Sequence, residues 1–106
     1  MIRDIRFSAK AKRQLKKYKK NRQIPAHALD KLRTWLETVG EFGIEAVQKA
    51  PNFHDHALKG NWAGFRSIYL DRTTWRLIYR IIKAPGSKDK LIIEFVDIVE
   101  VSPHEY

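Results

Sequence analysis

The chain has 106 residues, carries 21 Lys and Arg against 12 Asp and Glu, and contains no cysteine. This length accommodates one small domain over residues 1–106, and the lack of cysteine excludes disulfides and thiolate metal sites. No stretch resembles a signal peptide or a membrane helix of roughly 20 apolar residues, so we expect a cytoplasmic protein that does not bind membranes.

The positive charge is concentrated at the N-terminus. Residues 1–22 hold ten Lys and Arg and a single acid, Asp4, whereas residues 23–106 hold eleven of each sign. A basic block on one element can steer a protein toward nucleic acid or an acidic partner. The alternative interpretation is a solvated helix face that keeps the protein soluble.

The first half of the chain predicts one strand and two helices. Residues 2–7 alternate as a strand does, and Ser8 is a suitable cap for a helix over Ala9–Asn21. Pro25 suits the first turn of a second helix, which Gly40 is expected to end. The short connection between the helices predicts an antiparallel hairpin. A third, short helix is expected over Glu41–Ala50.

The second half predicts three strands, over Gly60–Leu70, Thr73–Lys83 and Lys90–Val101, because these segments are rich in β-branched and aromatic residues. A tight turn at Asp71–Arg72 and a looser one at Ala84–Asp89 favour a meander. The expected fold is therefore α+β, with the order β-α-α-β-β-β. A mostly antiparallel four-stranded sheet would carry the N-terminal helical hairpin on one face.

Three motifs follow one another in the second half. His56, Leu58, Gly60, Gly64 and Phe65 match the pattern (E/H)-x-L-x-G-x-x-x-G-(F/Y). The run Arg76-Leu77-Ile78-Tyr79 comes next, and the chain ends in VSPHEY. Together these motifs resemble the RelE/ParE toxin superfamily, nearest the YoeB and YafQ branches, and the order of elements is similar over nearly the whole chain.

The resemblance implies a RelE-like fold and the toxin of a type II toxin–antitoxin pair. Such a toxin is a ribosome-dependent endoribonuclease that cleaves mRNA in the A site by 2′-hydroxyl attack, without metal or cofactor. The implied partners are the ribosome, mRNA and a cognate acidic antitoxin. Operator DNA would be bound only through the complex with that antitoxin.

Cleavage of this kind needs a base, a cation for the phosphorane and an acid for the leaving oxygen. His56 is the predicted base, because imidazole accepts a proton near neutral pH. Arg76 is the predicted cation, because guanidinium matches a phosphate edge. His104 in the tail is the predicted acid. We expect these three side chains to share one surface, opposite the helical hairpin.

Each assignment has a structural alternative. His56 could be a surface histidine, Arg76 could pair with Asp97 or Glu100 across strands, and the tail could be frayed. Further RNA contacts are predicted for aromatic and basic residues in the motifs and the first helix. They are Lys59, Arg66, Tyr69, Tyr106, Lys16, Lys17, Lys19 and Lys20.

Two other functions share this pattern of fold and charge. A ParE-like protein would inhibit DNA gyrase and cleave no RNA, but such proteins generally lack a set like His56, Arg76 and His104. A non-catalytic RNA- or DNA-binding module would use the basic first helix alone. A metal site at His54-Asp55-His56 is not expected, because the spacing and the missing cysteine are unsuited to one.

Overall fold

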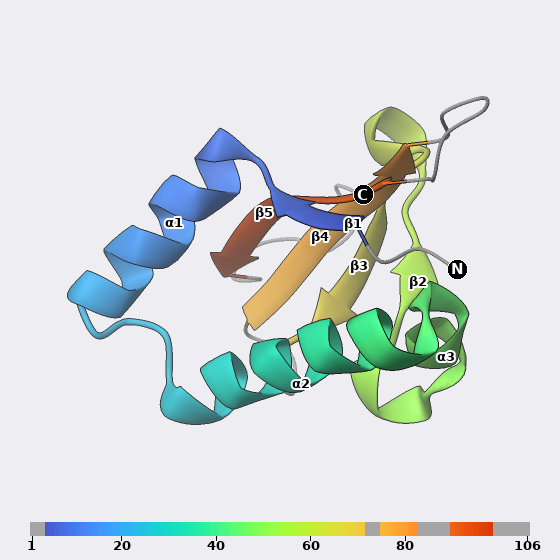
Figure 1. Cartoon of the computed structure of the whole chain (residues 1–106). Coiled ribbons are helices and arrows are strands. Elements are labelled where there is room, and N and C mark those ends of the chain that lie inside the picture. The colour runs from blue at the N-terminus through green and yellow to red at the C-terminus, as the bar shows by residue number, and fades with distance from the viewer. Residues whose placement is uncertain (1–3, 72–74, 83–89, 99–106) are drawn as a thin grey trace.

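The computed structural model describes residues 4–71, 75–82 and 90–98. In chain order the elements are β1 (Asp4–Phe7), α1 (Ala9–Lys20), α2 (Ala26–Phe42), α3 (Ile44–Lys49), the 3₁₀ turn η1 (Pro51–Phe53), β2 (His56–Ala57), the 3₁₀ turn η2 (Gly60–Trp62), β3 (Arg66–Tyr69), β4 (Trp75–Ile82) and β5 (Lys90–Ile98). The predicted α+β class is confirmed (Figure 1).

The sheet is mixed and has five described strands in the order β1-β5-β4-β3-β2. Only the β1–β5 pair is parallel, and the other three pairs are antiparallel. The predicted number of four strands was wrong, because the short edge strand His56–Ala57 adds a fifth beside β3. This strand carries the predicted base to the edge of the sheet.

The segment predicted as one strand, Gly60–Leu70, is divided in the structure. Its first residues form η2, and Gly64 adopts a φ of 93°, which an extended strand does not use. Strand β3 therefore begins only at Arg66. The loop between β2 and β3 holds Lys59 and Trp62 at the end of the sheet.

The start of α1 is fixed by Ser8, as the sequence predicts. The hydroxyl oxygen accepts a hydrogen bond from the Ala11 amide at 3.0 Å and donates to the Glu94 carbonyl at 2.9 Å. The Ser8 amide also donates to the Ile93 carbonyl at 2.8 Å. One residue therefore caps the basic helix and attaches it to β5.

The end of α2 differs from the prediction. Gly40 lies inside the helix, which continues to Phe42 and ends at Gly43, where φ is 90°. Only the second glycine reaches a conformation that terminates a helix favourably. The third helix accordingly starts at Ile44 rather than Glu41.

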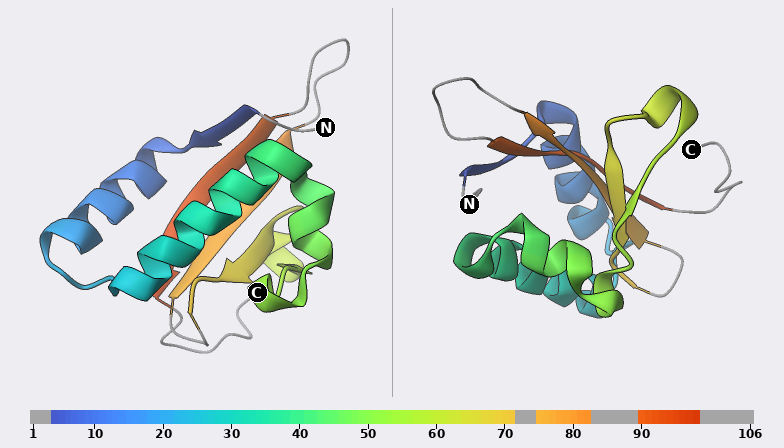
Figure 2. Two further views of the ribbon diagram at one scale, coloured as in Figure 1. Left: turned by 60° about the horizontal axis from the view of Figure 1, so that its bottom comes forward. Right: turned by 90° about the vertical axis from the view of Figure 1, so that its right-hand side faces the viewer.

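The main core lies between α2 and one face of the sheet, and Figure 2 shows α2 and α3 on that side. Trp35 is fully buried, and its ring packs against that of Tyr79 at 5.3 Å between centroids. Tyr18 of α1 joins the same core by an edge contact with Trp75 at 5.0 Å. Within the described ranges, each helix is too short or too polar to cross a membrane.

Gly40 and Gly64 both lie in a backbone conformation that differs from the predicted one. Alanine substitutions at these two positions make a matched test. Gly64→Ala should lower the free energy of unfolding by about 1–2 kcal/mol, because alanine is strained at positive φ. Gly40→Ala should raise it by about 0.5–1 kcal/mol, because alanine is favoured within a helix and nothing lies within 4 Å of the added methyl. Urea unfolding measures both, and equal signs would contradict the assigned backbone conformations.

Candidate functional site

The strand register places the predicted base and cation on the same face of the sheet. His56 pairs with Ser67, and Tyr69 pairs with Arg76. Directly paired residues share a face, as do alternate residues of one strand, so all four side chains lie on one side. Ile68, the residue between Ser67 and Tyr69, belongs to the core under α2. The site face is therefore the one opposite α2, which agrees with the expectation for His56 and Arg76.

His56 is exposed, and its orientation is set by the backbone just before it. Its Nδ1 lies 2.8 Å from the carbonyl oxygen of His54. Since a carbonyl only accepts, this contact assigns the proton of a neutral imidazole to Nδ1 and leaves Nε2 as the acceptor. In this tautomer a neutral His56 can accept a proton at Nε2.

Tyr69 connects the histidine edge to the arginine. Its ring lies 6.1 Å from the ring of His56 and 6.3 Å from that of His54, between centroids. On its other side it is the direct register partner of Arg76 in β4. The half-buried tyrosine thus lies between the predicted base and the predicted cation, where a nucleotide that meets both would contact it.

Arg76 is half-buried in the middle of the sheet. Its register partner in β5 is Asp97, the residue proposed in the alternative cross-strand ion pair. The side chain of Asp97 and the whole of Glu100, the other partner of that alternative, lie outside the part of the chain that is described. The register places the Arg76 side chain on the face that carries Tyr69. The catalytic role of Arg76 stays a prediction.

A cluster of polar side chains on the other face of β2 was missed from the sequence. The Asp55 side chain is 0% exposed and receives the Arg66 Nε–H at 2.6 Å. The Tyr79 hydroxyl donates to the second Asp55 oxygen at 2.5 Å and accepts from Gln48 Nε2 at 3.3 Å. We call Asp55, Arg66, Tyr79 and Gln48 the Asp55 cluster, and it joins α3, β3 and β4 to the residue before His56.

Within the Asp55 cluster, the carboxylate stabilises the protonated forms of its two hydrogen-bond donors. Burial and the hydrogen bond to Asp55 raise the pKa of the Tyr79 hydroxyl, so tyrosine remains the donor at neutral pH. Burial alone would lower the pKa of Arg66, but the hydrogen bond and charge of Asp55 outweigh it and raise that pKa. The arrangement is a satisfied buried carboxylate with two charge-assisted contacts.

The remaining predicted RNA contacts fall in different places. Lys59 is exposed on the loop after β2. Arg66 pairs with Tyr79 across strands and bonds Asp55, so it belongs to the helix-side face rather than to the site face. His104 and Tyr106 lie outside the described residues, and their roles stay predictions.

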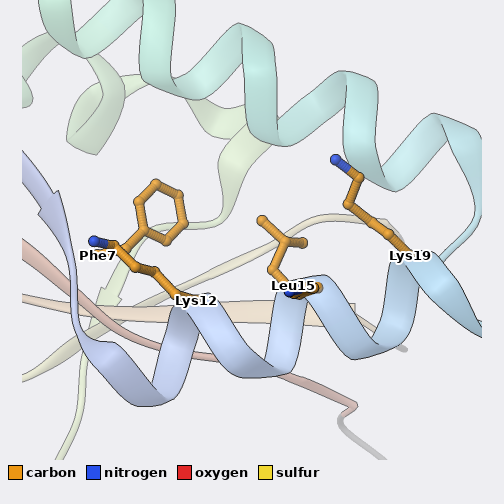
Figure 3. A pocket seen from close by; sticks show the side chains of 5 residues that line it. Phe7, Lys12, Leu15 and Lys19 are labelled. Carbon is orange, nitrogen blue, oxygen red and sulfur yellow. The ribbon is translucent and has the colours of Figure 1, made fainter.

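The lysines of α1 lie on two sides of the helix. Lys12, Lys16 and Lys19 follow one another at helical spacing and line a hollow of about 310 Å³ with Phe7 and Leu15. Figure 3 shows Phe7, Leu15 and Lys19 directed toward α2. From α2, the adjoining hollow of about 320 Å³ is lined by Leu29, Leu32, Arg33 and Leu36. We call the two hollows together the α1–α2 groove.

A second set of basic residues, Lys10, Arg13 and Lys17, also repeats at helical spacing and, at about 100° per residue, projects from the back of α1, away from the groove. All three are exposed. Of the predicted contacts, Lys16 and Lys19 thus line the groove, Lys17 lies on the back, and Lys20, one turn after Lys16, lies between the two sides. No acid interrupts either set, because α1 contains none.

A polar pocket of about 410 Å³ adjoins the Tyr69 end of the site, and its lining residues are His27, Lys31, His54, Leu70 and Asp71. His27 Nε2 lies 3.7 Å from Asp71. Burial lowers the pKa of Lys31, although the charge of Asp71 opposes the shift. Among the described residues, no three His, Cys, Asp or Glu side chains form a group that could hold a metal ion.

Comparison with known proteins agrees with this fold. The family model described as the bacterial toxin of type II toxin–antitoxin systems, YafQ, matches residues 3–105. The chain therefore belongs to the YafQ toxin family. Among curated protein sequences, none matches it.

Several solved structures share this fold. YafQ from E. coli strain BL21(DE3) superposes with a TM-score of 0.67 at 22% identity, over 91% of this chain and 92% of that one. The toxin in the E. coli DinJ–YafQ toxin–antitoxin complex gives 0.66 at 22% identity, over 92% and 93%. A YoeB/ParE toxin from Agrobacterium tumefaciens gives 0.62 at 17% identity, over 90% and 96%.

Proposed function

We propose that this YafQ-family chain is an endoribonuclease that cleaves mRNA in the ribosomal A site, in the bacterial cytoplasm, without a metal ion or cofactor. The observation that carries the proposal is the geometry of His56. Its Nδ1 contact with the His54 carbonyl leaves Nε2 to accept a proton, on the sheet face that also bears Arg76.

The proposed reaction uses the RNA's own 2′-hydroxyl. Nε2 of His56 takes the hydroxyl proton while the 2′-oxygen attacks the adjacent phosphorus. Arg76 stabilises the negative charge that develops on the phosphorane oxygens. The bond from phosphorus to the 5′-oxygen then breaks, and His104 returns a proton to that oxygen. The products are a 2′,3′-cyclic phosphate and a free 5′-hydroxyl.

RNA would be held by aromatic and basic groups around these residues. Tyr69 offers a ring beside His56, and stacking on a base contributes roughly 1–3 kcal/mol. Lys59 and Tyr106 are proposed as further contacts. Arg66 lies on the helix-side face with its Nε–H bonded to Asp55, so we do not propose it as a contact of RNA on the site face.

A purified translation system tests the proposal directly. Ribosomes programmed with a defined mRNA should yield fragments that end at the A-site codon and carry a cyclic phosphate, in the presence of a chelator selective for transition metals and of the Mg²⁺ that the ribosome needs. An intact mRNA together with inhibited DNA gyrase would instead indicate a ParE-like activity. Growth arrest that survives replacement of His56, Arg76 and His104 would indicate a non-catalytic binding module.

The proposed partner that restrains this activity is an acidic antitoxin encoded beside the gene. The α1–α2 groove offers it an apolar floor with a basic rim, and an amphipathic helix with acidic flanks is complementary to both. Operator DNA would be contacted only through that complex. The basic residues on the back of α1, Lys10, Arg13 and Lys17, are proposed to face ribosomal RNA.

Two charge-matched variants separate these roles. Lys12, Lys16 and Lys19 changed together to Gln should weaken binding of the neighbouring gene's product about tenfold, since rim ion pairs are each worth a few tenths of a kcal/mol. The same change at Lys10, Arg13 and Lys17 should instead weaken ribosome binding and flatten its salt dependence. Titrations at several salt concentrations measure both, and identical behaviour of the two variants would contradict the division.

A further inference from the structure

We infer that Asp55 is a positioning residue for His56, and that its buried carboxylate holds the edge strand in the one orientation that presents Nε2 to the substrate. The inference rests on the proposed function, in which His56 is the base. Asp55 itself points to the helix-side face and does not meet RNA.

Strand β2 needs an anchor because it is very short. It consists of two residues at the edge of the sheet, and the described strands pair with it from one side only. Two residues of edge pairing do not fix a strand by themselves. A catalytic base must be held within about 0.5 Å of its productive position. Contacts made by Asp55, the residue before the strand, must therefore supply the necessary rigidity.

The Asp55 cluster supplies that anchor from two strands and a helix. One carboxylate oxygen takes the Arg66 Nε–H of β3 at 2.6 Å, and the other takes the Tyr79 hydroxyl of β4 at 2.5 Å. Gln48 of α3 donates to the same hydroxyl at 3.3 Å. Both oxygens of the Asp55 carboxylate are therefore held.

The backbone transmits this constraint to the imidazole. His54 adopts a left-handed conformation with φ of 53°, which turns the chain sharply just before Asp55. The turn sends the Asp55 side chain inward, and alternation along the strand then sends His56 to the opposite face. The same turn brings the His54 carbonyl to 2.8 Å from Nδ1 of His56, which is the contact that sets the tautomer.

Replacing Asp55 by asparagine should disturb this arrangement without changing its volume. Arg66 and Tyr79 donate to different oxygens of Asp55, and an amide replaces one of these acceptors with an NH₂ donor, so one of the two bonds is lost or must be rearranged. We expect Asp55→Asn to lower the single-turnover rate constant about tenfold or more at saturating ribosomes, because a misplaced group costs rate rather than binding. The half-saturating ribosome concentration should change less than twofold. Tyr79→Phe should cause a smaller loss in the same direction.

The decisive measurement is a double-mutant cycle. If Asp55 acts through His56, the double variant Asp55→Asn/His56→Ala should be no slower than His56→Ala alone. A further tenfold loss in the double variant would show an independent structural role and overturn the inference. Asp30→Asn, in an exposed ion pair with Arg33, is the matched control and should keep the full rate.

Nitrogen NMR of the His56 ring gives a readout that does not depend on catalysis. The wild-type spectrum should show the Nδ1–H tautomer at high pH, and Asp55→Asn should shift it toward a mixture of tautomers. If His56→Ala cleaves RNA normally, the proposed base fails, but the spectrum still tests the positioning. An unchanged tautomer and an unchanged rate in Asp55→Asn would refute the inference.

Discussion

His56→Ala should slow single-turnover RNA cleavage on ribosomes by about 10²–10⁴-fold, the usual contribution of a positioned general base. The reason is that Nε2 is the acceptor the His54 carbonyl contact leaves available on the site face. His56 is exposed and its ring fills no core position, so the fold and the ribosome affinity should change little. Rapid-quench cleavage with ribosomes in excess measures the loss.

The pH dependence separates a base from a mere contact. A base must be neutral to work, so the wild-type rate should rise with pH on the acid limb, and this limb should vanish in His56→Ala. His56→Glu should keep part of the activity and move the acid limb down, because the ordinary carboxyl pKa of about 4.3 lies below the imidazole value of about 6.5. The alkaline limb should vanish in His104→Ala.

A neighbouring histidine provides the control. His54→Asn keeps the carbonyl that bonds Nδ1, and asparagine tolerates the left-handed backbone at this position better than most residues. This variant should cleave at close to the wild-type rate. His56→Ala with normal cleavage across the pH range would reject the base assignment and leave the arginine as the main catalytic group.

The parts of the fold that local signals determine could be predicted from the sequence. Ser8 marks the start of α1 because its side chain can cap only a helix that begins there, and the structure has that bond. The apolar runs of β4 and β5 predict strands because of their β-branched composition. The prediction ended α2 at Gly40, but the helix ends at Gly43. The sequence alone does not show which of the two glycines adopts a positive φ.

The parts that distant residues determine could not be predicted. Parallel pairing of β1 with β5 joins segments about eighty residues apart, and no local pattern specifies it. Asp55 looks like a surface residue in sequence, and its burial depends on Arg66, Tyr79 and Gln48 arriving from three other elements. The predicted base is indicated by its motif, whereas the buried carboxylate of the residue before it is evident only in three dimensions.

Arg76→Ala should lower the single-turnover cleavage rate by about 10²–10³-fold, the loss typical when one donor to a developing oxyanion is removed. Arg76 pairs with Tyr69 in register and so lies on the face that carries His56, where the phosphorane charge would develop. A guanidinium presents two parallel donors to phosphate, and an ammonium presents a point charge. Arg76→Lys should therefore recover only part of the rate.

The alternative role of Arg76, a cross-strand ion pair with Asp97, makes a different prediction. If the arginine only pairs with its register partner, Arg76→Ala should lower the free energy of unfolding and leave the cleavage rate of the folded protein unchanged. If Arg76 is catalytic, Arg76→Ala should instead lower the cleavage rate and leave the free energy of unfolding nearly unchanged. Added guanidinium should then restore part of that rate. Arg33→Ala, an exposed arginine on α2, is the control for lost charge and should cleave normally. Normal circular dichroism together with full cleavage by Arg76→Ala would assign this arginine to the sheet rather than to the reaction.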